Sequence, residues 1–167
     1  SCLKRRIIKT VILYASKYGY TAEIVENIKA QLDGDVQAID VSKEKVPNLE
    51  HVDGIILGSS IYVGQIHKSL KQWMEQNQSL LLSKRIAVFL CSGFASEFEK
   101  NLQANFPKLI LDHALSCDYL GGRIDKSKLS FMHKQLVNMI EKTEAGKQTI
   151  HAYPERCVDL VQRFQSR

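Results

Sequence analysis

The sequence contains no long apolar segment and no closely spaced cysteine pair. No apolar run approaches the roughly 20 residues that a membrane-spanning helix needs, so we expect no transmembrane segment and a cytoplasmic location. The apolar stretch after the basic start, SCLKRRIIKT, is short and has no small-residue cleavage site, so we interpret it as a first strand rather than a signal peptide. The four cysteines form no C-x-x-C motif, which predicts reduced and mostly buried thiols.

Several catalytic and phosphate-binding motifs are also missing. The absence of G-x-x-x-x-G-K-(S/T) excludes a nucleoside-triphosphatase P-loop, and no G-x-G-x-x-G follows the first predicted strand. No G-x-S-x-G or nucleophilic Cys/His motif is present, and the histidines show no metal-ligand spacing. The sequence therefore predicts no metal site and no catalytic acid, base or nucleophile.

Charge narrows the classes of partner. The formal net charge is +5 and the pI is near 9, which favours anionic ligands, nucleic acid or an acidic membrane. The basic residues are scattered, however, and cluster only at Lys4–Arg6. We therefore expect no nucleic-acid partner, whereas peripheral contact with a membrane stays open.

What is present is a regular alternation of strands and helices. The length predicts a single domain over residues 1–167. Apolar patterns predict strands over 7–14, 36–41, 53–60, 85–93 and 113–122, and helices over 21–33, 69–76, 96–106, 127–142 and 154–164. Continuous apolar strands separated by amphipathic helices predict an α/β protein with a three-layer, doubly wound, five-stranded parallel sheet. The strand order 2-1-3-4-5 fits five strands in this length.

Three signals mark expected helix ends. Gly34 is expected to end the first helix, and Pro107 the helix over 96–106. Ser96 and Glu99 have the spacing of a capping box at the start of that helix.

In sheets of this type ligands bind beyond the carboxyl ends of the strands, at the switch point in strand order. Three loops lie there: SKYGYT after the first strand, SSIYVGQIH after the third and CSGFASE after the fourth. A response-regulator receiver shares this order but needs acidic residues at the first strand end, where Tyr14, Ala15 and Ser16 stand here.

The loop SKYGYT has the chemistry of a phosphate cradle. Unpaired N–H groups at a helix N-terminus carry partial positive charge and bind phosphate readily. Ser16 and Thr21 add hydroxyl groups, Gly19 lets the backbone turn close to a ligand, and the only charge is that of Lys17. The alternative is a plain Ser/Thr helix cap followed by a turn glycine.

Ser16-Lys17-Tyr18-Gly19-Tyr20-Thr21 resembles the flavodoxin phosphate loop, (S/T)-x-x-G-x-T, which cradles the phosphate of FMN. The resemblance implies FMN as cofactor. An isoalloxazine ring needs a flat slot with aromatic or apolar faces and backbone hydrogen bonds. The second and third loops are expected to supply them through Ser60, Ile61, Tyr62, Val63, Gly64, Ser92, Gly93 and Phe94.

Individual ring-loop residues carry further expectations. The Val63–Gly64 peptide is the candidate to rotate and accept a hydrogen bond from the reduced ring, because glycine tolerates positive φ. Tyr62 either lies on a ring face or points to solvent, and Phe94 either covers the ring or packs into the core. Cys91, at the end of a buried strand, is expected to pack rather than react.

The segment S-I-x-x-G-x-x-H, Ser60 to His67, resembles the flavin loop of flavodoxin-type, menaquinone-dependent protoporphyrinogen oxidases. This resemblance implies an FMN-dependent oxidoreductase that passes electrons to a quinone, another small molecule or a redox partner. The alternative is a plain flavodoxin, which transfers electrons without a substrate of its own. His67 either starts a helix facing water or lies near the flavin edge. The characterised oxidases carry a long basic insertion after strand 4, whereas this sequence passes from Gly93 almost directly into a helix near Ser96.

Overall fold

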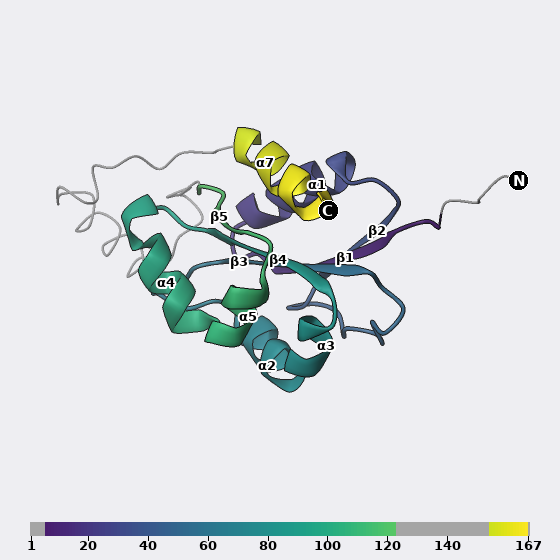
Figure 1. The fold of residues 1–167 in the computed structure, drawn as a ribbon. Coiled ribbons are helices and arrows are strands. Elements are labelled where there is room, and N and C mark those ends of the chain that lie inside the picture. Colours follow the sequence, from purple (N-terminus) through teal and green to yellow (C-terminus); the bar gives the residue numbers. More distant parts are fainter. Residues whose placement is uncertain (1–5, 123–153, 167) are drawn as a thin grey trace, which may run out of the picture.

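A computed structural model describes residues 6–122 and 154–166. The elements of these residues, in chain order (Figure 1), are β1 Lys9–Ala15, α1 Tyr20–Gln31, β2 Asp35–Asp40, β3 Gly54–Ser60, α2 Lys68–Gln76, α3 Gln78–Leu82, β4 Arg85–Cys91, the 3₁₀ helix η1 Ala95–Glu97, α4 Phe98–Asn105, α5 Lys108–His113, β5 Cys117–Tyr119 and α7 Pro154–Gln165. Within this part of the chain, no helix combines the length and the apolar composition that crossing a bilayer requires.

The sheet confirms the predicted architecture. Its order is β2-β1-β3-β4-β5, and every neighbouring pair is parallel. The register aligns Ala15 with Ser59 and Ser60 with Cys91. The loops that follow β1, β3 and β4 therefore leave the sheet at the same edge.

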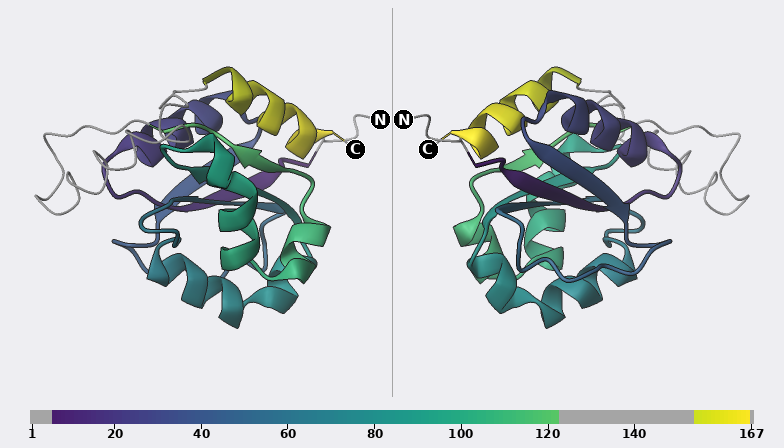
Figure 2. Two further views of the ribbon diagram at one scale, coloured as in Figure 1. Left: turned by 90° about the vertical axis from the view of Figure 1, so that its left-hand side faces the viewer. Right: turned by 90° about the vertical axis from the view of Figure 1, so that its right-hand side faces the viewer.

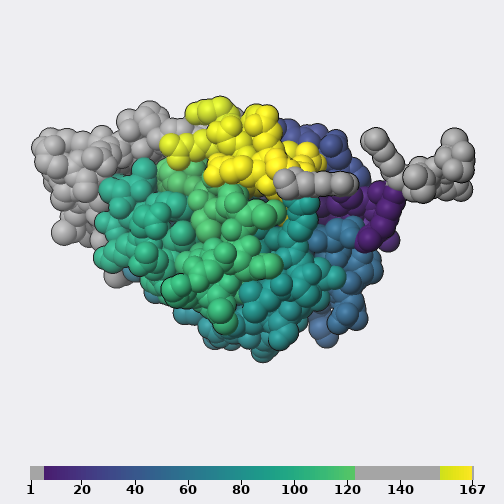
Figure 3. Space-filling view, viewed as in Figure 1, coloured from purple at the N-terminus to yellow at the C-terminus, as the bar shows by residue number. Residues whose placement is uncertain are grey.

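Helices cover both faces of the sheet (Figure 2). Because side chains alternate along a strand, Ile56 of β3 faces a core shared with α1 and α7, whereas Ile55 and Leu57 face the core under α2 to α5. All three are fully buried. In the space-filling view α7 lies across the top of the molecule (Figure 3). The central strands are thus buried on both faces, as their continuous apolar sequences predict.

The predicted role of Gly34 is wrong. Helix α1 ends at Gln31, and Leu32 occupies the C-cap. Gly34 has a φ of 85° and leads into β2, where a Cβ would lie 2.3 Å from the carbonyl oxygen of Ile8. Its function is to let two backbone segments approach each other.

The other differences concern short elements. The capping box of Ser96 and Glu99 is wrong, because the chain first forms η1 and then begins α4 at Phe98, whose N-cap Glu97 makes no side-chain cap hydrogen bond. Helices α3 and α5, of five and six residues, are too short for periodicity to reveal. The predicted fifth strand contracts to Cys117–Tyr119. The helix predicted over 127–142 lies outside the described residues.

Candidate functional site

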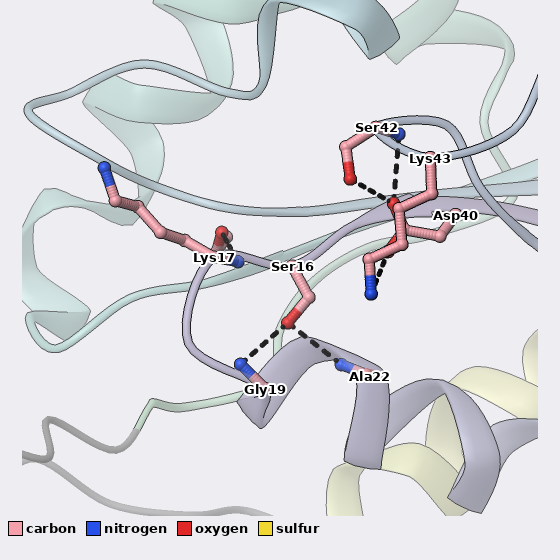
Figure 4. A network of polar contacts seen from close by, with 8 residues as sticks. Ser16, Lys17, Gly19, Ala22, Asp40, Ser42 and Lys43 are labelled. Carbon is pink, nitrogen blue, oxygen red and sulfur yellow. Dashed lines mark hydrogen bonds and ion pairs between the residues drawn. The ribbon is translucent and has the colours of Figure 1, made fainter. Parts of the chain in front are cut away.

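The loop between β1 and α1 forms an open turn at the N-terminus of the helix. Gly19 is the N-cap residue, with a left-handed φ of 91°. No atom of the described residues would lie within 4 Å of a Cβ at this position, so they leave the space beside the turn free. Ser16 Oγ accepts hydrogen bonds from the N–H groups of Gly19 (3.1 Å) and Ala22 (3.3 Å), as Figure 4 shows. The helix cap is therefore observed, and binding of phosphate by the same loop stays a prediction.

Thr21 carries a buried hydroxyl whose bonding is incomplete. The residue is 1% exposed, and its Oγ1 has no hydrogen-bond partner of normal geometry among the described residues. This hydroxyl lies beside the thiol of Cys91. Its presence lowers the pKa of the thiol, against the larger effect of burial, which raises it. Buried hydroxyls are almost always paired, so this atom has capacity left for a ligand.

Lys17 connects the first loop to the second. Its backbone N–H donates to Ser60 Oγ (3.3 Å), and its Nζ lies 3.1 Å from the centre of the Tyr62 ring. The same ammonium group is 5.7 Å from the centre of the Tyr18 ring. Both distances are within the range of cation–π attraction. The lysine thus holds a positive charge against the aromatic rings at the mouth of the site.

A tight turn forms the tip of the second loop. Tyr62 and Gln65 exchange two backbone hydrogen bonds, of 2.9 and 3.0 Å, across Val63 and Gly64. Gly64 has a φ of 72°, as its sequence position predicts. Val63 has a φ of 49°, although left-handed backbone is costly for a β-branched residue, and its side chain is 65% exposed. Sequence reasoning missed this strain, because no local signal marks it.

The third loop is attached to the second through the ends of their strands. The N–H of Ile61 donates to the carbonyl oxygen of Cys91 (2.9 Å). Ser92 donates through its hydroxyl to the carbonyl oxygen of Phe94 (3.3 Å), and its own carbonyl accepts a hydrogen bond from the Tyr119 hydroxyl (2.5 Å). Phe94 is half-buried. The structure thus brings the three predicted loops together at one edge of the sheet.

Two residues of the predicted site direct their side chains into the protein. Tyr20 is 7% exposed, and its hydroxyl donates to the carbonyl oxygen of Leu120 (2.7 Å). Ile61 packs against the core under α2 to α5. Tyr20 therefore has only its backbone left for contact with a ligand, whereas the Ile61 side chain is partly buried.

A pocket of about 470 Å³ opens beside the first two loops, on the side nearer β2. Its lining residues are Ser16, Lys17, Ser42, Ser60, Tyr62, Gln65, Ile66, His67 and Lys68. His67 caps α2, because its Nδ1 accepts a hydrogen bond from the N–H of Ser69 (3.1 Å). The hydroxyl of Ser42 donates to Asp40 (2.5 Å; Figure 4). Sequence reasoning did not single out Gln65 and Lys68, which belong to the second loop or follow it directly, or Ser42, which only the strand order brings here.

A larger pocket, of about 830 Å³, lies at the opposite edge of the sheet. There Arg6 pairs with Asp53, and Arg85 donates to the carbonyl oxygens of Phe164 and Ser166. These charged groups fasten the N-terminal segment and the end of α7, so the chemistry favours the carboxyl edge as the functional site. In residues 6–122 and 154–166 no group of three His, Cys, Asp or Glu side chains could hold a metal ion.

Of the predicted buried cysteines, Cys2 lies outside the described residues, and two of the other three are in the core. Burial raises the pKa of the Cys91 thiol to about 12, from an ordinary value of 9.0, and raises those of Cys117 and Cys157 to about 11. All three are free thiols, and Cys91 and Cys157 are buried. This confirms the expectation that Cys91 packs into the core.

The raised thiol pKa values predict a loss of stability in alkali. The folded protein keeps these thiols protonated, whereas the unfolded chain ionises them above about pH 9. Unfolding then releases protons, so the free energy of unfolding should fall as pH rises from 9 toward 11. Urea denaturation at pH 8 and pH 10 measures this fall, which should be smaller in Cys91→Ala. An equal pH dependence in the two proteins would contradict the assignment to the thiol.

Comparison with known proteins agrees with this geometry. The family model described as flavodoxin domain matches residues 11–150. Protoporphyrinogen IX dehydrogenase (quinone) from Escherichia coli (strain K12) is 23% identical over 149 residues, which cover 84% of this chain and 82% of that protein. Two solved structures share the fold. Oxidised flavodoxin 1 from Bacillus cereus has a TM-score of 0.53 and 19% identity, covering 93% of this chain and 96% of its own. A flavoprotein in complex with FMN from Lactobacillus acidophilus NCFM has a TM-score of 0.52 and 18% identity, covering 67% and 93%. The chain belongs to the flavodoxin domain family.

Proposed function

We propose that this protein is an FMN-dependent oxidoreductase. The observation that carries the proposal is the open turn at Gly19, which faces free space at the N-terminus of α1. An anion placed there would meet the amides that Ser16 Oγ now caps and the Ser16 hydroxyl itself. No carboxylate stands in the loop to repel it. Relatives support the choice of anion, since a solved flavoprotein of the same fold is in complex with FMN.

The residues of the three loops fit FMN as a group. Residues 16–21 would hold the phosphate, and residues 60–64 and 92–94 would hold the ring. When bound, FMN supplies the redox chemistry, because its ring accepts and returns electrons. The protein's own part is to bind and orient the ring and to offer it the Val63–Gly64 peptide. Lys17 adds a positive charge, which Tyr62 holds in place.

The relative from Escherichia coli supports a quinone as electron acceptor, because its name describes a quinone-dependent dehydrogenase of protoporphyrinogen IX. We propose that this chain likewise takes electrons from a reduced small molecule and passes them to a quinone or a redox partner. Only three residues, 92–94, separate β4 from η1, so the chain lacks, at this point, the long insertion that the characterised oxidases carry after strand 4. A single domain over 1–167 and a cytoplasmic location complete the proposal.

A plain electron-transfer flavodoxin is the second candidate. It is favoured by the flavodoxin from Bacillus cereus, which this fold matches over 96% of that chain. The net charge of +5 argues against it, because an acidic field is what steers such carriers to basic partners. Anaerobic reduction with a panel of donors and acceptors, quinones included, separates the two. Turnover with a small donor indicates an enzyme, and exchange with redox proteins alone indicates a carrier.

The first test of the proposal is the identity of the flavin. The purified protein is expected to bind FMN rather than FAD, because the loop offers a cradle for a single terminal phosphate. Extraction of the bound flavin, followed by chromatography, identifies it. A protein that contains FAD, or that binds no flavin after soaking in FMN, would contradict the proposal.

A further inference from the structure

A buried asparagine makes hydrogen bonds to the C-terminal side of the turn in the second loop, at Gly64 and Ile66. Asn105, the last residue of α4, is 3% exposed. Its Nδ2 donates to the carbonyl oxygen of Gly64 (2.9 Å), and its Oδ1 accepts a hydrogen bond from the N–H of Ile66 (3.1 Å). Nδ2 also donates to the carbonyl oxygen of Asn101 (2.8 Å). Burial of an amide costs free energy unless it is paired, and here two of its three bonds go to the turn.

The tip of the same turn is restrained differently. Among the described residues, no hydrogen bond involves the carbonyl oxygen of Val63 or the N–H of Gly64. The peptide that joins these residues is therefore free to rotate, whereas the next peptide is fixed by Asn105 through the carbonyl oxygen of Gly64. Val63 is already in a left-handed conformation, so the current orientation of its peptide is not strongly favoured.

We propose that Asn105 is a positioning residue for the flavin ring, an inference that rests on the proposed function. It holds Gly64 and Ile66, so that reorientation is confined to the Val63–Gly64 peptide. The carbonyl oxygen of Val63 can then turn toward the protonated nitrogen of a reduced ring while the rest of the turn stays ordered. Because Asn105 already orders the rest of the turn, reorientation of the Val63–Gly64 peptide toward reduced flavin costs less conformational entropy. Asn105 therefore favours binding of reduced over oxidised flavin.

The test compares affinities for the two redox states of FMN. In Asn105→Leu, which keeps the branched shape but has no hydrogen-bonding group, the Kd of reduced FMN should rise at least tenfold more than that of oxidised FMN. This lowers the two-electron midpoint potential by about 30 mV. Spectroelectrochemistry gives the potential, and fluorescence titration gives the oxidised Kd. Asn105→Ser has a side chain too short to make both hydrogen bonds to the turn, so it should show the same shift in potential. It replaces the leucine variant in this test if that variant does not fold.

Leu102→Ala is the matched control, because Leu102 is also buried in α4 but has no side-chain hydrogen bond to offer the turn. It should lower stability and leave the ratio of the two affinities unchanged. In the flavin-free proteins, hydrogen exchange at the N–H of Ile66 should accelerate more in Asn105→Leu than in Leu102→Ala.

The outcomes separate this inference from the proposed function. If wild-type protein binds FMN and the affinity ratio is the same in Asn105→Leu, or if Leu102→Ala shifts it equally, the role of Asn105 is overturned and the proposed function stands. If wild-type protein binds no FMN, the proposed function fails, and the role of Asn105 fails with it.

Discussion

Gly19→Asp is expected to weaken FMN binding at least tenfold, which is about 1.4 kcal/mol. Two effects act in the same direction. The glycine has a φ of 91°, which strains any residue with a Cβ, and the new carboxylate would stand at the N-terminus of α1, where the phosphate is expected. Among the described residues no atom lies within 4 Å of a Cβ at Gly19, so no steric clash adds to the backbone strain, and the main loss is expected in FMN affinity. Fluorescence titration with FMN measures it.

Gly19→Asn separates charge from conformation. Asparagine has nearly the shape of aspartate and tolerates left-handed backbone, so it should retain most of the affinity that Gly19→Asp loses. Raising the salt concentration should partly restore binding to Gly19→Asp, because exposed charges are screened. If the two variants bind FMN equally, no anion binds at this turn. If both bind as tightly as wild type, the loop assignment is wrong.

The large elements of this fold could be predicted from sequence because their apolar patterns are continuous. β3 and β4 are buried on both faces, and the loops at their carboxyl ends follow from parallel pairing alone. The (S/T)-x-x-G-x-T loop predicts a turn at Gly19 for the same reason, because a strand ends and a helix begins around it, and in the structure Gly19 is the N-cap of α1. The position of this loop between a strand and a helix, and the residues within it, predict the same turn. That prediction depends on no contact distant in sequence.

Features that depend on distant contacts could not be predicted. Asn105 reaches the turn at Gly64 only because the fold places the end of α4 beside the loop after β3, and an asparagine before Phe106 and Pro107 is typical of an ordinary helix end. The left-handed Val63 contradicts its own propensity, and only the completed turn maintains it.

The role of Gly58 also depends on a contact distant in sequence, and this contact leads to a prediction about stability. Its sequence position, beside Ser59 and Ser60, suggests a small residue at the mouth of the site. In the structure it pairs with Phe89 across β3 and β4, and a Cβ would lie 2.0 Å from the Cζ atom of that ring. Phe89 is fully buried, so the ring has no free space to move into.

Replacement of glycine by alanine usually stabilises a protein by about 0.4–1 kcal/mol, because it restricts the unfolded chain, whereas overpacking a core costs about 1–3 kcal/mol. Gly58→Ala should therefore lower the free energy of unfolding, as urea denaturation would measure.

A double-mutant cycle tests whether the Phe89 ring is the cause. Phe89→Leu alone should destabilise the protein, because it leaves unfilled space in the core that contains α1 and α7. In the double variant, Gly58→Ala with Phe89→Leu, the smaller leucine makes room for the methyl group of the alanine. The two losses in the free energy of unfolding should therefore not add, and their coupling energy should be about 0.5–3 kcal/mol. Additive losses would mean that the methyl group is accommodated elsewhere and that Gly58 is small for another reason. A coupled result would assign Gly58 to packing, and Ser60, which is partly exposed and lines the pocket, would be the first residue of β3 available to the site.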